Sequence, residues 1–167
     1  MNAPRAIVVM GVSGCGKTSV GVALSENLGW PFYDGDDFHP EANVAKMAAG
    51  QPMDDDDRAP WLAILRDLIR DHLKADKSLI LACSALKEKY RTQLADGNHG
   101  TIFVHLHGDF DLIYNRMMAR SEHYMRAVML RSQFDTLELP QDAIVIEIDQ
   151  SVEMITKEIF AQLRFQD

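Results

Sequence analysis

The sequence lacks several features that would place it in other classes of protein. Its 167 residues include only two cysteines, Cys15 and Cys83, without the spacing of a metal site, so we expect free thiols. No apolar run approaches the ~20 residues needed to span a bilayer, and no signal peptide precedes the first apolar run. We therefore expect a cytoplasmic protein that binds no membrane. Lys and Arg number 17 against 25 Asp and Glu, and this net charge of −8 disfavours nucleic acid as a partner.

What is present is an alternation of short apolar runs with helical patterns. A chain of this length can form one α/β domain with a substantial core, and no repeat or linker divides it. The expected strands are 6–10, 30–33, 79–83, 102–106 and 143–148. The expected helices are 19–28, 40–49, 61–71, 87–95, 110–137 and 152–163. This order predicts a single α/β domain, 1–167, in which a parallel five-stranded sheet lies between two helical layers in a three-layer αβα fold.

One motif follows the first strand directly. It is Gly11-Val12-Ser13-Gly14-Cys15-Gly16-Lys17-Thr18, which fits G-x-x-x-x-G-K-[ST] at every fixed position. Backbone N–H groups of such a loop surround phosphates, and the next helix points its positive end at the same place. Lys17 is expected to reach the β- and γ-phosphates of ATP, and the Thr18 hydroxyl to hold Mg²⁺. The Cys15 thiol, near a helix N-terminus, is expected to have a lowered pKa.

Phosphoryl transfer also requires a group near the metal and one that orients the attacking hydroxyl. The third strand ends in Cys83-Ser84 and offers no acid, whereas the second strand leads into Asp34-Gly35-Asp36. Our hypothesis is that Asp34 acts on Mg²⁺ through water and that Asp36 accepts the proton of the substrate hydroxyl. The alternative is that both carboxylates only cap a turn, which is common for Asp beside Gly.

Other side chains are candidates for holding an anionic substrate. Arg58 offers a bidentate fork to a carboxylate or phosphate, while two or three of the four Asp residues in 54–57 are expected to be solvated in a loop. His39 either hydrogen-bonds a polyol or caps a helix. Lys87, with Ser84, is either a substrate or phosphate contact or a surface lysine at a helix start.

Two segments, 37–60 and 117–140, have weak core patterning and are expected to move. We expect a lid at about 117–140 and a substrate-binding helical segment at about 37–75. Arg116, Arg120 and His123 are spaced i, i+4, i+7 and would share one helix face. That face either folds the two arginines over ATP or is exposed to solvent.

Blocks along nearly the whole chain resemble the gluconate kinases, which are related in fold to the shikimate and nucleoside monophosphate kinases. The blocks are Met10-Gly11-Val12-Ser13-Gly14 with Gly16-Lys17, Asp34-Gly35-Asp36 with His39-Pro40, Asn43, Lys46-Met47 and Gly50, Asp55-Asp56-Asp57-Arg58 with Pro60-Trp61-Leu62, Cys83-Ser84-Ala85-Leu86-Lys87 with Tyr90-Arg91, and Ser132-Gln133-Phe134 with Leu137-Glu138 and Pro140. The resemblance implies ATP:D-gluconate 6-phosphotransferase activity, a Mg²⁺ requirement, a mobile lid and usually a homodimer.

The resemblance also implies roles for single residues. It places Asp34 near the metal, Asp36 at the substrate hydroxyl and Arg58 at the substrate carboxylate. Arg120 matches a lid arginine that approaches ATP. Gln133 lies in the block Ser132-Gln133-Phe134, which ATP binding in general does not require, so we assign Gln133 to the substrate. The sequence departs from the family pattern at Cys15, where Ser is common, and in the lid at 124–127.

Two rival functions stay open. One is a kinase for another small hydroxy acid such as shikimate, although the triple-glycine loop of shikimate kinases is missing. The other is a nucleotide-binding module without turnover, which would have no need of Lys17, Thr18, Asp34 and Asp36 together. A GTPase is disfavoured because the sequence has no Asn-Lys-x-Asp motif.

Overall fold

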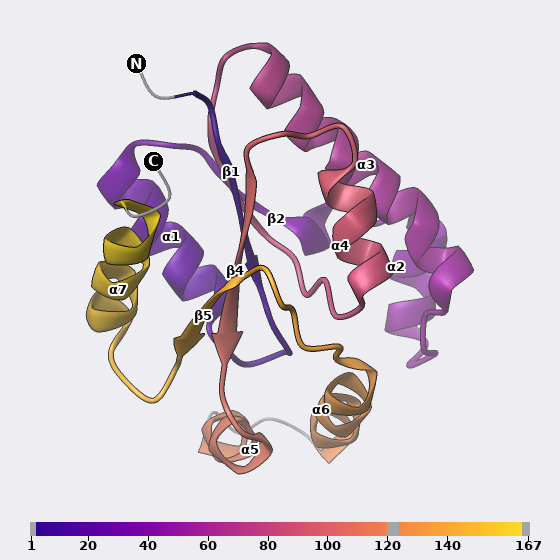
Figure 1. Ribbon diagram of the computed structural model, residues 1–167. Helices are drawn as coiled ribbons and strands as arrows, with labels where there is room; N and C mark the ends of the chain where they lie inside the picture. Colours follow the sequence, from indigo (N-terminus) through magenta and orange to yellow (C-terminus); the bar gives the residue numbers. More distant parts are fainter. Residues whose placement is uncertain (1–2, 120–123, 165–167) are drawn as a thin grey trace.

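The computed structural model of the chain describes residues 3–119 and 124–164 (Figure 1). Its strands are β1 (Ala6–Met10), β2 (Phe32–Asp34), β3 (Leu79–Ala82), β4 (Thr101–His107) and β5 (Ile144–Glu147). They form one all-parallel sheet in the order β2-β3-β1-β4-β5. The predicted parallel five-stranded sheet is therefore confirmed, and its carboxyl edge is the place where ligands bind in open sheets of this kind.

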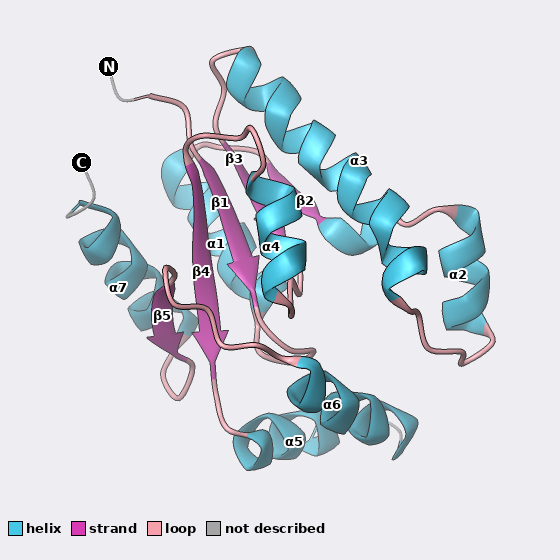
Figure 2. Ribbon diagram, turned by 45° about the vertical axis from the view of Figure 1, so that its right-hand side comes forward, coloured by secondary structure: helices cyan, strands magenta, loops and turns pink. Residues whose placement is uncertain are grey.

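Helices cover both faces of this sheet. They are α1 (Lys17–Leu28), the 3-10 helix η1 (Gly35–Phe38), α2 (Glu41–Ala48), α3 (Asp55–Lys74), α4 (Glu88–Ala95), α5 (Phe110–Ala119), α6 (Tyr124–Thr136) and α7 (Val152–Arg164). α1 and α7 pack together on one face, and α3 and α4 on the other. Figure 2 shows α5 and α6 beyond the carboxyl ends of the strands.

β1 lies at the centre of the core. Its five residues are buried on both faces, as a continuous apolar run in a parallel sheet predicts. Ile7 and Val9 join the apolar cluster under α1 and α7, while Val8 and Met10 join the cluster under α3. Burying each such side chain contributes about 1.5–3 kcal/mol. The strand thus anchors the motif that follows it in the middle of the molecule.

α3 begins earlier than the sequence patterning predicted. Its N-cap is Asp54, and Asp54 and Asp57 form a reciprocal capping box that starts the helix before Pro60. The polar stretch 51–60 was expected to start the helix with an Asp cap, so the cap is confirmed and only the helix start, expected at residue 61, was wrong. The capping box satisfies backbone N–H groups of the first turn, so these two carboxylates are structural rather than merely solvated.

The segment 110–137 forms two helices, α5 and α6, where one long helical stretch was expected. They lie at an angle to one another (Figure 2). Arg120 and His123 lie outside the described residues, so their expected face shared with Arg116 stays a prediction. Arg116 itself donates from Nη2 to the Ile148 carbonyl oxygen at 2.8 Å.

Because His105 on β4 is buried, we expect acid to lower the stability of the fold. Burial, His107 and Arg91 lower the pKa of this imidazole, which is 2 % exposed, to about 4. The unfolded chain, with a pKa near 6.5, takes up the proton first, so stability is full above about pH 6.5 and is lost as the pH falls toward 4. The loss is at most about 3 kcal/mol.

Urea unfolding at several pH values measures this loss. The variant His105→Gln is expected to show a flatter dependence between pH 6.5 and 4, whereas His99→Gln, at an exposed position, is expected to keep the wild-type slope. Equal slopes for wild type and His105→Gln would show that acid acts elsewhere.

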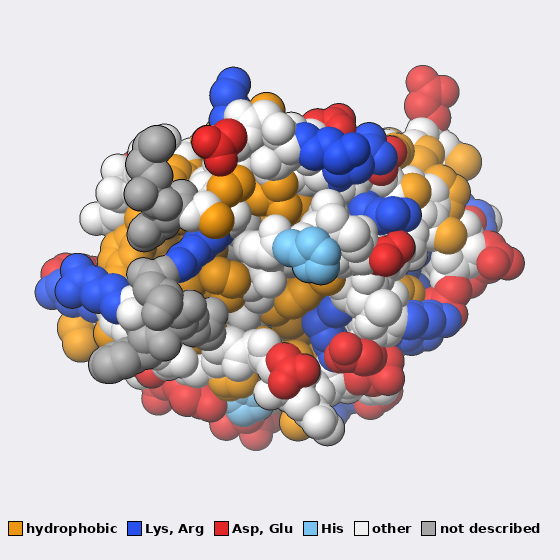
Figure 3. Space-filling view, turned by 45° about the horizontal axis from the view of Figure 1, so that its top comes forward, with side chains coloured by type: hydrophobic (Ala, Val, Ile, Leu, Met, Phe, Trp, Pro, Cys, Tyr) orange, Lys and Arg blue, Asp and Glu red, His pale blue; other side chains and the backbone are white. Residues whose placement is uncertain are grey.

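The excess of acidic residues is not gathered into one surface on the face shown in Figure 3. There, Lys and Arg side chains lie in separate groups among Asp and Glu side chains, with hydrophobic side chains between them. Within the described ranges, no helix has the length and apolar character required to cross a membrane.

Candidate active site

The phosphate loop forms between β1 and α1, as the motif predicted. Gly11 has φ +144°, and a Cβ there would lie 2.8 Å from Cys15 Sγ and 2.9 Å from the Leu106 carbonyl oxygen, so only glycine fits. Gly16 adopts a left-handed conformation and caps α1, which begins at Lys17, two residues earlier than expected. The N-terminus of α1 therefore points its unpaired N–H groups at the loop.

Lys17 lies folded onto this loop. Its ammonium donates to the carbonyl oxygens of Gly11 and Val12, each at 3.0 Å. The same charge is close enough to Asp36 to oppose the rise in the pKa of that carboxyl. The fold thus brings Lys17 and Asp36 to one edge of the sheet, as the hypothesis required.

The turn that carries Asp34 and Asp36 is held rigidly. The backbone N–H of Asp36 donates to Asp34 Oδ1 at 3.0 Å, so Asp34 does cap η1, as the alternative interpretation proposed. A Cβ on Gly35 would lie 2.7 Å from the Ala82 carbonyl oxygen, and the Gly35 carbonyl oxygen accepts the indole N–H of Trp61 at 2.7 Å. β3 and α3 together hold the backbone just before Asp36 in place.

Asp36 combines a raised pKa with an open position. Surrounding protein atoms raise the pKa of this carboxyl most, the Asp34 carboxylate raises it further, and His39 and Lys17 oppose the rise. Because 82 % of the side chain stays exposed, water screens much of the effect in this open structure. A bound substrate that displaces water would strengthen it, which favours a group that accepts a proton near neutral pH.

His39 connects Asp36 to α2 and α3. Its side chain is only 2 % exposed and stacks on Trp61, with ring centroids 4.3 Å apart. The Asn43 amide nitrogen lies 3.2 Å from His39 Nδ1 and donates to the Asp57 carbonyl oxygen at 2.9 Å. With Nδ1 accepting from this amide, the imidazole proton lies on Nε2, 3.7 Å from Asp36 Oδ1. Burial lowers the pKa of His39, while Asp36 opposes this shift, so the neutral ring is favoured at neutral pH.

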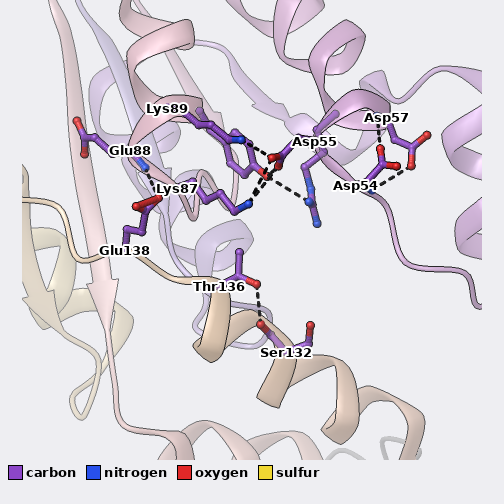
Figure 4. A network of polar contacts seen from close by, with 11 residues as sticks. Asp54, Asp55, Asp57, Lys87, Glu88, Lys89, Ser132, Thr136 and Glu138 are labelled. Atoms are coloured by element: carbon purple, nitrogen blue, oxygen red, sulfur yellow. Dashed lines mark hydrogen bonds and ion pairs between the residues drawn. The ribbon is translucent and has the colours of Figure 1, made fainter.

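A cationic cluster lies where α3 meets the start of α4 (Figure 4). Asp55 accepts from Lys87 Nζ at 3.2 Å and also from Lys89 and the Tyr90 hydroxyl. These bonds, that of Lys89 first, hold the pKa of the Asp55 carboxyl well below its usual range. Arg58 Nη1 donates to the same Tyr90 hydroxyl at 3.2 Å. Two ammonium groups thus share the Asp55 carboxylate, and the Arg58 guanidinium lies beside them on the Tyr90 hydroxyl.

Arg58 also relates this cluster to Asp36. Its charge helps to lower the pKa of His39, which in turn lies against Asp36. Ser84 joins the cluster's loop to the phosphate loop, because its carbonyl oxygen accepts the Gly11 N–H at 3.2 Å. The predicted residues Lys17, Asp36, Arg58, Ser84 and Lys87 therefore belong to one region of the molecule.

Sequence analysis missed the residues that support this region. Asp55 and Tyr90 bind the cations, and Asn43 and Trp61 hold His39. Tyr90 and Trp61 belong to the blocks that resemble the gluconate kinases, which was the available signal. Their roles depend on contacts between distant elements and leave no local pattern.

Cys15 contradicts the expected thiol chemistry. Burial raises the pKa of its thiol and outweighs the nearby Lys17 charge, whose Nζ lies 4.0 Å from Sγ. The expectation of a lowered pKa was therefore wrong, because the side chain packs into the core under the loop. Burial also raises the pKa of Cys83 to about 12.

We accordingly expect both thiols to be unreactive in the folded protein. A thiol-reactive disulfide reagent at neutral pH should label neither cysteine within minutes and both after denaturation, since the thiolate is the reacting form. Rapid labelling of the folded protein that ATP prevents would contradict this expectation.

The donor set fits Mg²⁺ held mainly by phosphates and water. Thr18 is exposed in the first turn of α1, and Asp34 accepts the Asp36 N–H through Oδ1. Among the described residues, no group of three or more His, Cys, Asp or Glu could hold a metal ion. Mg²⁺ in nucleotide sites commonly has one or two protein ligands and keeps several waters, so this sparse set is sufficient.

The fold and this site define a phosphate-loop kinase, and comparisons with known proteins agree. The shikimate kinase family profile matches residues 13–164, so the chain belongs to that family. Within it, the chain groups with the gluconokinases. It is 42 % identical to the gluconokinase of Gluconobacter oxydans (strain 621H), covering 98 % of this chain and 94 % of that protein.

Two further relatives support this grouping. The chain is 44 % identical to the thermoresistant gluconokinase of Escherichia coli (strain K12), covering 87 % of this chain and 86 % of that protein. A crystal structure of a gluconokinase from Sinorhizobium meliloti 1021 matches with a TM-score of 0.87 and 39 % identity, covering 100 % of this chain and 99 % of that one.

Proposed function

We propose that this protein is a gluconokinase, which transfers the terminal phosphoryl group of ATP to the 6-hydroxyl of D-gluconate and releases ADP and 6-phospho-D-gluconate. The observation that carries the proposal is the meeting of the phosphate loop, the Asp36 carboxylate and the Arg58–Lys87 cations at one edge of the sheet. The identity of about 40 % to named gluconokinases over most of the chain supports gluconate as the acceptor.

The proposed acceptor site uses both ends of gluconate. Arg58 and Lys87 attract its carboxylate, with Arg58 offering two parallel N–H donors. Asp36 accepts the proton of the 6-hydroxyl as its oxygen attacks the phosphorus. His39, neutral and with its Nε2 proton facing Asp36, orients that carboxylate rather than binding the polyol directly.

On the donor side, the loop N–H groups and Lys17 bind the phosphates of ATP. Lys17 exchanges its bonds to the Gly11 and Val12 carbonyl oxygens for bonds to phosphate oxygens. The Thr18 hydroxyl and, through water, Asp34 would hold Mg²⁺, which would supply charge neutralisation at the phosphates. Arg116 and Arg120 are proposed to approach ATP from the lid at about 117–140.

We also propose that the protein is cytoplasmic and that, as the resemblance to gluconate kinases implies, it forms a homodimer. The net charge of −8 supports a small-molecule substrate rather than nucleic acid as its ligand.

A coupled assay of ADP release tests the function. Mg-ATP is offered with gluconate, shikimate, glycerate, AMP or CMP in turn, and gluconate alone is expected to stimulate turnover strongly. Stimulation by another acceptor instead of gluconate would refute the substrate. No turnover with any acceptor would favour a nucleotide-binding module.

A further inference from the structure

Gln133 on α6 makes a two-point contact with the phosphate loop. The backbone N–H of Ser13 donates to Gln133 Oε1 at 2.6 Å, and Gln133 Nε2 donates to Ser13 Oγ at 2.9 Å. The two residues are 120 positions apart in the chain. Both are half-buried, so the pair lies where a ligand can reach it.

This contact occupies a backbone donor of the phosphate loop. Backbone N–H groups of a phosphate loop point inward to bind phosphate oxygens. In the structure, the amide oxygen of Gln133 accepts a hydrogen bond from the Ser13 N–H, and the Lys17 ammonium donates to carbonyl oxygens of the loop. A nucleotide phosphate that uses Ser13 N–H must therefore displace Gln133.

Gln133 lies in the last turn of α6, and the chain that follows this turn leads directly to the acceptor side. Just beyond α6, the Glu138 N–H donates to the Leu86 carbonyl oxygen at 2.8 Å, and Glu138 Oε1 accepts the Glu88 N–H at 3.1 Å (Figure 4). Leu86 and Glu88 flank Lys87, a proposed ligand of the substrate carboxylate. A change at Gln133 can thus reach Lys87 through one helix.

Arg91 makes this link stiff. The side chain is 3 % exposed, and its guanidinium donates to the carbonyl oxygens of Ala85 at 2.6 Å and Glu138 at 2.8 Å. Ala85 has φ +44°, a conformation that costs a non-glycine residue energy and that Arg91 helps to hold. The loop before α4 therefore has little freedom to move independently of the end of α6.

We propose that Gln133 is a positioning residue that holds the phosphate loop in the nucleotide-free enzyme. When ATP takes the Ser13 N–H, the contact between Gln133 and the loop breaks, and α6 can then adjust the position of the loop that carries Lys87. This inference rests on the proposed function for the identity of the acceptor. It revises the assignment of Gln133 to the substrate, since the contact it makes is with the donor side.

Calorimetric titration with ADP and a non-hydrolysable ATP analogue tests the proposal without any turnover. Gln133→Ala removes the competitor, and we expect the ATP analogue to bind about fivefold or more tightly while kcat falls. Gln133→Glu keeps an acceptor and adds negative charge, so we expect binding to weaken about tenfold. A purely structural loss would weaken binding in both variants.

Two further variants complete the test. Ser13→Ala removes only the hydroxyl partner of Gln133, so we expect it to tighten binding of the ATP analogue less than Gln133→Ala does. The effects of the two substitutions are expected to be non-additive. Ser13→Ala also tests the proposal if Gln133→Ala does not fold. Asp135→Asn, exposed on the same helix, is expected to leave nucleotide affinity unchanged. Unchanged or weaker analogue binding in Gln133→Ala, with a raised KM for gluconate alone, would overturn the proposal, whether or not gluconate is the acceptor.

Discussion

Asp36→Asn is expected to lower kcat by about 10²-fold or more while changing the KM for gluconate much less. An amide cannot accept the hydroxyl proton, and general-base contributions are typically of this size. Steady-state rates with Mg-ATP and gluconate measure the effect. Asp37→Asn, an exposed neighbour on η1, is the matched control and is expected to keep nearly wild-type activity.

The pH profile gives this prediction a second readout. Because only the ionised Asp36 accepts a proton, wild-type kcat/KM falls as the pH falls through the raised pKa of this carboxyl. The residual activity of Asp36→Asn is expected to lack that acid limb. An unchanged kcat in the variant would remove Asp36 from the mechanism.

Arg58→Met is expected to raise the KM for gluconate by about 10- to 100-fold, because hydrogen bonds to charged groups are worth about 1.5–3 kcal/mol each. The KM for ATP should change little. Arg58→Lys keeps the charge but loses the fork, so an intermediate effect is expected. Arg66→Met, on the solvent side of the same helix α3, is the control.

Whether the KM for gluconate or the KM for ATP changes decides if this prediction holds. A rise in the KM for ATP with gluconate binding intact would place Arg58 on the donor side. A fall in kcat alone would show that it acts on the transition state rather than on substrate binding.

The sheet and the phosphate loop were predictable because both have local signatures. The β1 run is apolar without interruption, and the glycines of the loop stand at fixed positions. The Asp cap of α3 was predictable from the run of Asp residues, but the helix start was placed too late because Pro60 suggests a loop, whereas the capping box of Asp54 and Asp57 begins the helix before it.

The support of the site depended on contacts that no local pattern encodes. In α2, Val44 and Met47 form an apolar pair yet are 51 % and 42 % exposed, whereas the buried residue is the polar Asn43. Its amide lies against His39, so a polar contact rather than apolar packing determines the inner face of this helix. The pKa of Cys15 could not be inferred either, because it depends on how deeply the thiol is buried.

The arrangement is tested most directly by a crystal structure of the protein with gluconate, Mg²⁺ and a non-hydrolysable ATP analogue. The 6-hydroxyl is expected within about 2.6–3.2 Å of an Asp36 carboxylate oxygen, with the gluconate carboxylate at Arg58 and Lys87. Gluconate bound in the reverse orientation, or away from Asp36, would contradict the proposed phosphoryl transfer.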